Sequence, residues 1–205
     1  MDNIKVHTVE HRIMGFFSVV KSFIIEDNDL TLIDTGINAG SSKTIIQKLA
    51  VLGHDLSDVD LCILTHAHRD HIGGLKALKS TGSSFLVAAY DAEADAVEKS
   101  TGVEVELRLT DGQQIGGIKV LYLPGHTLGS IALLIGDSLF TGDALNGGGD
   151  GLKPPNLMFT KDKEAAMASV RHLEFYDFER VFVSHGKDVL SGGREALNRL
   201  IAELG

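Results

Sequence analysis

The chain has 205 residues, 43% of them hydrophobic and 23% charged, and its 19 Lys and Arg against 28 Asp and Glu give a net charge of −9. This composition is that of a globular protein and excludes a disordered or coiled-coil chain, while the acidic balance argues against nucleic acid as a partner. No apolar run is long enough to cross a membrane, no signal peptide is evident, and the single cysteine, Cys62, cannot form an internal disulfide, so we expect a cytoplasmic protein.

The first half of the chain shows strand patterns followed by an alternation of strands and helices. A hairpin is expected first, because turn residues 26–29 separate two runs rich in Val, Ile and Phe. Ser41 or Ser42 is predicted to cap a helix that ends at Gly53, and the wholly apolar residues 61–64 predict a strand buried on both faces. The expected strands cover 16–26, 30–33, 61–64 and 85–89, and further helices are expected over 75–79 and 92–100.

The second half has the same character. Asp162 is predicted to start a helix, and Ser191 to cap a last helix over 194–204. Strands are expected over 119–123, 131–135, 138–140 and 180–183, and the glycine-rich residues 146–153 are expected to form a loop. With no linker in between, the pattern predicts a single domain, residues 1–205, built from two sheets with helices packed outside them.

Four polar motifs follow apolar strands, at the positions where α/β folds gather their functional loops. The first, residues 65–71, places three histidines and an aspartate within six positions. Neutral imidazole and carboxylate oxygen are the ligands that Zn²⁺, Fe and Mn take in proteins. In an extended segment His66 and His68 point the same way and can share one metal ion, while Asp70 and His71 follow as the chain turns. The other three motifs are Gly125-His126-Thr127, Thr141-Gly142-Asp143 and Ser184-His185-Gly186.

The motif His66-x-His68-x-Asp70-His71, followed by Gly73-Gly74, resembles the signature of the metallo-β-lactamase superfamily. The three later motifs match the remaining metal motifs of that family in order, and Asp34-Thr35-Gly36 resembles its first motif. Within the family the chain is similar to the glyoxalase II-like hydrolases. The resemblance implies an α/β fold, an αββα sandwich of two mixed β-sheets flanked by helices, with a metal site at one edge of the sheets.

The resemblance also implies a set of site residues and two divalent metal ions. Zn²⁺ is the expected metal, and Fe and Mn are the alternatives. Asp143 would bridge the two ions, and Asp34 would orient the metal ligands without binding a metal itself. Asp70 and Asp143 are the expected catalytic carboxylates. The implied ligands are His66, His68 and His126 for the first ion, and Asp70, His71 and His185 for the second.

The expected function is that of a binuclear metallohydrolase that attacks a thioester, ester or lactone with a metal-bridging hydroxide. The partner is then a small-molecule acyl substrate, with no nucleic acid and no membrane involved, and the protein is a monomer or a homodimer. Three alternatives stay open: an iron-dependent persulfide dioxygenase, a nuclease and a non-catalytic binding protein. Full-length glyoxalase II enzymes add a helical domain that binds glutathione, whereas 20 residues follow His185, which leaves the role of glutathione open.

Two segments are expected to shape the substrate pocket. Residues 12–17 and 145–159 mix apolar side chains with glycine and carry few basic residues. The expected pocket residues are Met14, Phe16, Leu145, Met158 and Phe159. The histidines outside the motifs are expected on the surface or on helices, with a place near the mouth of the site as the alternative for His11: His7, His11, His54 and His172.

Overall fold

The computed structural model describes residues 4–12, 19–149 and 151–204. Contacts within the chain divide it into two compact units, Met1–Arg108 and Leu109–Gly205. In the described parts of the chain, no helix has the length and apolar character needed to span a membrane. The chain is a mixed α/β protein, and the prediction of a single domain stays a prediction.

The first unit is built on a six-stranded mixed sheet in the order β1-β2-β3-β4-β5-β6. The first three strands are antiparallel neighbours, whereas β3, β4 and β5 run parallel. Parallel neighbours need crossovers, and helices supply them here. The strands are β1 (Lys5–Arg12), β2 (Val19–Glu26), β3 (Leu30–Ile33), β4 (Leu61–Leu64), β5 (Leu86–Tyr90) and β6 (Leu107–Leu109).

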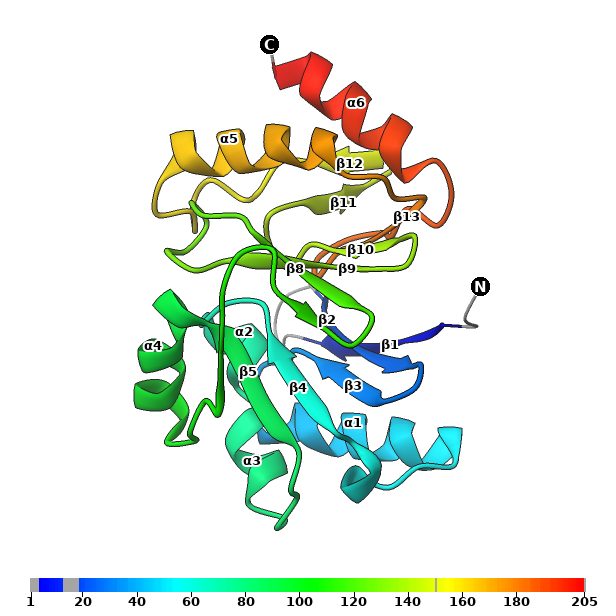
Figure 1. Cartoon of the computed structure of the whole chain (residues 1–205), viewed down its shortest axis with the longest axis vertical. Helices are drawn as coiled ribbons and strands as arrows, with labels where there is room; N and C mark the ends of the chain where they lie inside the picture. Colours follow the sequence, from blue (N-terminus) through cyan, green and yellow to red (C-terminus); the bar gives the residue numbers. More distant parts are fainter. Residues whose placement is uncertain (1–3, 13–18, 150, 205) are drawn as a thin grey trace. The chain divides into compact units, whose positions relative to one another are not determined.

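Helices of the first unit pack on one face of this sheet (Figure 1). Their apolar residues, such as Ile45, Leu49 and Val97, form a core with the strand residues Cys62 and Leu64. Cys62 is fully buried, and burial raises the pKa of its thiol, so it is a packed apolar residue as its strand position indicates. The helices are α1 (Ala39–Leu52), α2 (Arg69–Ile72), α3 (Leu75–Lys79) and α4 (Asp91–Thr101), with a short 3₁₀ turn over Leu56–Asp58.

The start of α1 differs from the expectation. Asn38, rather than Ser41 or Ser42, is the N-cap, and its side chain accepts a hydrogen bond from the Gly40 amide. The Ser41 hydroxyl instead accepts from the Ile37 amide, and the Ser42 hydroxyl donates to the Ala39 carbonyl. The predicted end is confirmed, since Gly53 ends the helix in the left-handed conformation.

The second unit has a five-stranded sheet in the order β13-β10-β9-β8-β7. Only β10 and β13 are parallel in it, and α5 and α6 cover one face (Figure 1). The elements are β7 (Gln114–Ile115), β8 (Ile118–Tyr122), β9 (Ile131–Ile135), β10 (Ser138–Phe140), β13 (Arg180–Phe182), α5 (Lys163–His172), a 3₁₀ turn (Leu173–Phe175) and α6 (Gly193–Leu204).

Two further expectations are wrong, one on the glycine-rich segment and one on His11. The glycine-rich residues 146–153 form a small hairpin of β11 (Asn146–Gly148) and β12 (Gly151–Lys153) rather than a loop. His11 is not a surface residue, because it lies on β1, pairs in register with Val20 and is buried. Its Nε2 is 3.0 Å from the Ser22 hydroxyl.

The burial of His11 predicts a pH dependence of stability. Burial lowers the pKa of the His11 ring from 6.5 to about 4. Above pH 6.5 the ring is neutral in both the folded and the unfolded chain. Between pH 6.5 and 4 only the unfolded chain takes up this proton, so the free energy of unfolding falls as the pH falls, by at most about 1.4 kcal/mol per pH unit.

Urea unfolding of wild type and His11→Gln at pH 7.5, 6 and 5 measures this contribution. Gln keeps a polar contact to Ser22 but does not titrate, so we expect the variant to lose less stability on acidification. Parallel losses in the two proteins would contradict this account of His11.

Candidate metal centre

The loop after β4 carries the four predicted ligands of the first unit. His68 is the N-cap of α2, which begins at once with Arg69 and so turns Asp70 and His71 back toward the two earlier histidines. The ring centroid of His66 lies 4.7 Å from that of His68 and 4.0 Å from that of His71. The Asp70 Oδ2 atom is 3.9 Å from His71 Nε2. Three imidazoles and a carboxylate are thus concentrated on one short turn.

Asp34 supports this loop from β3. Its Oδ1 accepts from the Thr65 amide and its Oδ2 from the Thr65 hydroxyl, both at 2.8 Å. The same Oδ2 is 2.7 Å from Nδ1 of His71. Because a carboxylate accepts, His71 donates from Nδ1 and keeps Nε2 as the atom that can bind a metal ion. Asp34 adopts a φ of +59°, a strained conformation that these hydrogen bonds hold in place.

Gly73 and Gly74 allow the loop to approach Asp34-Thr35-Gly36. A Cβ atom at Gly73 would lie 1.9 Å from the Ile37 carbonyl oxygen, and one at Gly74 would lie 2.2 Å from that of Thr35. The approach lets the Gly73 amide donate to the Gly36 carbonyl, and the Thr35 amide to the His71 carbonyl. The two glycines of the motif therefore have a backbone role beside the ligands.

Glu93 is a contributor that the sequence did not indicate. This buried residue in the first turn of α4 accepts a hydrogen bond from the Ala67 amide at 2.8 Å. Ala67 lies between His66 and His68, so Glu93 holds the backbone of the ligand loop and adds a negative charge beside it. An acidic residue in the first turn of a helix is common, and no local pattern distinguishes this one.

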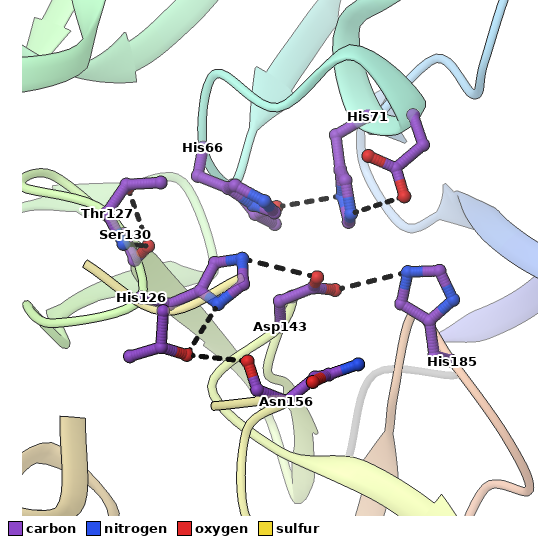
Figure 2. A network of polar contacts seen from close by, with 12 residues as sticks. His66, His71, His126, Thr127, Ser130, Asp143, Asn156 and His185 are labelled. Carbon is purple, nitrogen blue, oxygen red and sulfur yellow. Dashed lines mark hydrogen bonds and ion pairs between the residues drawn. The ribbon is translucent and has the colours of Figure 1, made fainter. Parts of the chain in front are cut away.

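The second unit brings its three predicted ligands together around Asp143. Its Oδ2 is 3.3 Å from Nε2 of His126, and its Oδ1 is 3.6 Å from Nε2 of His185 (Figure 2). His126 and Asp143 follow β8 and β10, and His185 follows β13. One carboxylate thus presents each of its two oxygens to a different imidazole.

Backbone and side-chain contacts hold two of these loops. The Gly147 amide donates to the His185 carbonyl at 2.8 Å, and a Cβ at Gly186 would lie 2.2 Å from the Gly147 oxygen. The hairpin of β11 and β12 therefore lies directly against the His185 loop. Nδ1 of His126 is 3.3 Å from the Thr160 hydroxyl, which contacts the Asn156 carbonyl in turn. Sequence reasoning missed Asn156 and Thr160, because they belong to an irregular stretch before α5.

The donor set fits divalent metal ions. Two ligands of one tetrahedral Zn²⁺, each at 2.0–2.1 Å from it, are about 3.3 Å apart. The separation of His126 Nε2 and Asp143 Oδ2 has this value. Two other pairs are wider: His185 Nε2 and Asp143 Oδ1 are 3.6 Å apart, and His71 Nε2 and Asp70 Oδ2 are 3.9 Å apart. Imidazole nitrogen with carboxylate oxygen suits Zn²⁺, Fe and Mn alike. A His/Asp cluster suited to metal is therefore present, and the identity of the metal is not fixed by it.

The predicted pocket residues lie in different environments. Met14 and Phe16 fall outside the described residues. Leu145 is fully buried in the hydrophobic core of the second unit, where it is not available to a substrate. Met158 and Phe159 are exposed, in the stretch between β12 and α5. Of the predicted pocket residues that are described, these two are open to contact.

Two curated proteins illustrate what the chain is similar to in sequence. It is 34% identical to a hydroxyacylglutathione hydrolase of Shewanella baltica over 118 residues, which cover 56% of this chain and 43% of that enzyme. The chain thus matches less than half the length of this relative. It is also 31% identical over 202 residues to the Bacillus subtilis protein YobT, named as uncharacterized, covering 84% of this chain and 85% of that protein.

Solved structures share the fold. A metallo-β-lactamase from Pontibacter korlensis superposes with a TM-score of 0.76 at 21% identity, covering 98% of this chain and 94% of that one. A metallo-β-lactamase family protein of Thermus thermophilus gives a TM-score of 0.74 at 21% identity, covering 97% and 79%. The family model for the metallo-beta-lactamase superfamily matches residues 15–185, which include the first four motifs and reach His185 of the fifth. The chain belongs to the metallo-β-lactamase superfamily.

Proposed function

We propose that this chain is a binuclear metallohydrolase that cleaves a thioester, ester or lactone. The observation that carries the proposal is the placement of Asp143, whose two oxygens face Nε2 of His126 and Nε2 of His185. A carboxylate that meets a different imidazole on each oxygen is arranged to bridge two ions. The hydroxyacylglutathione hydrolase among its relatives, an enzyme named for a thioester substrate, supports acyl transfer to water as the reaction.

In this proposal each ion would be held by imidazoles and a carboxylate. The loop after β4 would supply two pairs of ligands, and Asp143 would offer one oxygen to each ion. The proposed ligands are His66, His68 and His126 for one ion and Asp70, His71 and His185 for the other, with Zn²⁺ as the expected metal.

Two divalent ions, when bound there, would supply a water molecule of lowered pKa and a Lewis acid for a carbonyl oxygen. The side chains around them have separate tasks. Asp34 fixes His71 with Nε2 available, through the 2.7 Å contact to Nδ1. Asp70 is partly exposed and can therefore pass a proton between the site and the leaving group. Asp143 would balance part of the positive charge of ions bound beside His126 and His185.

The substrate class follows from the exposed apolar side chains. Met158 and Phe159 offer contact area to an acyl chain or a lactone ring, and apolar contacts discriminate weakly, by about 1–3 kcal/mol per methylene. We therefore propose broad selectivity for uncharged acyl groups. Cytoplasmic location, the absence of a nucleic-acid partner and a monomeric or dimeric state stay predictions.

A hydrolysis panel tests the proposed reaction. Zinc-loaded protein should hydrolyse thioesters, esters or lactones of increasing acyl length, and a chelator should abolish turnover until zinc is restored. Oxygen uptake with a persulfide would indicate the dioxygenase, and faster cleavage of a phosphodiester would indicate a nuclease. Either result, or no turnover of any acyl substrate, would contradict the proposal.

The same panel locates the acyl group through a matched pair of variants. Phe159→Ala should lower kcat/KM increasingly as the acyl chain lengthens. Phe175→Ala is the control, because Phe175 is similarly exposed, 73% against 63%, and lies in the 3₁₀ turn after α5. Equal effects of the two variants would remove Phe159 from the pocket.

Asp143 and Asp34 should differ in their effect on metal content. Asp143→Asn keeps the shape but removes the charge shared by two ions, so we expect loss of at least one ion and of activity together. Asp34→Asn tolerates the positive φ and acts only through His71 and Thr65, so we expect about a 10–100-fold weaker metal affinity or activity.

Metal content per chain and turnover, measured on both variants, check this order. Asp137→Ala is a control, since Asp137 forms a surface ion pair with Arg180 and should leave both quantities unchanged. Full activity with both ions bound in Asp143→Asn would overturn the bridging role.

A further inference from the structure

Thr160 makes two hydrogen-bonding contacts beside a proposed metal ligand. The residue is 9% exposed. Its hydroxyl oxygen is 2.9 Å from the Asn156 carbonyl oxygen and 3.3 Å from Nδ1 of His126. The neighbouring backbone holds it there. The Lys161 amide donates to the His126 carbonyl, and the Asp162 amide donates to the Gly125 carbonyl. Residues 160–162 thus run along the His126 loop and bring the hydroxyl to the ring.

The direction of these hydrogen bonds is determined by their partners. A carbonyl oxygen only accepts, so the single hydroxyl hydrogen of Thr160 is donated to Asn156. The Thr160 oxygen therefore meets His126 as an acceptor, and Nδ1 of His126 carries the hydrogen. In a neutral imidazole the other nitrogen, Nε2, then holds the lone pair. That nitrogen faces Asp143 at 3.3 Å, where two acceptors meet favourably only around a cation.

We propose that Thr160 is a positioning residue that fixes His126 as the Nδ1–H form and so presents Nε2 as a metal ligand. The inference rests on the proposed metal site but not on the identity of the substrate. It completes a parallel between the units: His71 donates Nδ1–H to the carboxylate of Asp34, and His126 donates Nδ1–H to a neutral hydroxyl. A carboxylate acceptor makes a metal-binding imidazole a stronger ligand than a neutral hydroxyl acceptor does. Of these two histidines, His126 is therefore expected to be the weaker metal ligand.

Three variants separate positioning from stability. Thr160→Val has a similar size but no acceptor, so the buried Nδ1–H of a zinc-bound His126 loses its partner. Thr160→Ser keeps the hydroxyl group and should therefore keep the contact to His126 Nδ1 and the zinc affinity. Thr101→Val is the matched control, because Thr101 is 7% exposed, donates to the carbonyl four residues earlier and accepts from the Val103 amide, as Thr160 does from His126.

The first readout is zinc affinity, measured by competition with a chromophoric chelator on the full-length chain. We expect Thr160→Val to bind zinc about 10–100-fold more weakly, and Thr160→Ser and Thr101→Val to stay within about threefold of wild type. The second readout is the solvent exchange of the His126 Nδ1–H proton, followed by NMR in the zinc-loaded protein. It should be slow in wild type and Thr160→Ser and fast in Thr160→Val.

Unchanged affinity and unchanged exchange in Thr160→Val would overturn the proposal. An equal loss of affinity in Thr101→Val would also overturn it, because the effect would then be one of general stability. Both readouts are independent of turnover. A protein that shows the predicted affinity and exchange but hydrolyses no acyl substrate keeps the role of Thr160 and loses the proposed function.

Discussion

Lone pairs that face one another repel unless a cation lies between them, and this constraint applies to the ligand cluster of each unit. His71 donates from Nδ1 to Asp34 and turns Nε2 toward Asp70. Asp143 turns one oxygen to Nε2 of His126 and the other to Nε2 of His185. Such a concentration of imidazoles and carboxylates suits divalent cations far better than a packed protein interior. The rest of the fold around it supplies rigidity.

That rigidity comes from hydrogen bonds between the ligand loops and residues outside the proposed ligand set. Asp34 fixes Thr65 and His71 from β3, and Glu93 holds the Ala67 amide from α4. In the second unit the hairpin of β11 and β12 contacts the carbonyl of His185. Each ligand loop is short and follows a buried strand, so the strands determine where the loops begin and the supporting residues determine how the side chains point.

The sequence predicted the regular elements near the site well. β9 and β10 have the predicted bounds, and the apolar residues 61–64 form β4 as expected. These predictions succeed because buried strands of an α/β sheet have a simple apolar pattern. The strand β1 was not predicted, since His7, Glu10 and His11 interrupt its apolar pattern, although pairing with β2 buries His11.

The metal motifs were recognisable because a short stretch carries several ligands, whereas their supporting residues were not. Glu93 lies 26 residues from Ala67, and Thr160 lies 34 residues from His126. Such contacts depend on how loops fold back on one another, and a single Glu or Thr has no local signature. The small hairpin at residues 146–153 escaped prediction for a related reason, because glycine-rich segments usually indicate loops.

The central claim is that Asp143 bridges two metal ions, and anomalous diffraction from crystals of the zinc-loaded full chain tests it most directly. Data collected at the zinc absorption edge should show two peaks about 3.5–4 Å apart, with one oxygen of Asp143 on each. His126 should contact one peak and His185 the other. A single peak, or two peaks with Asp143 bound to neither, would contradict the account.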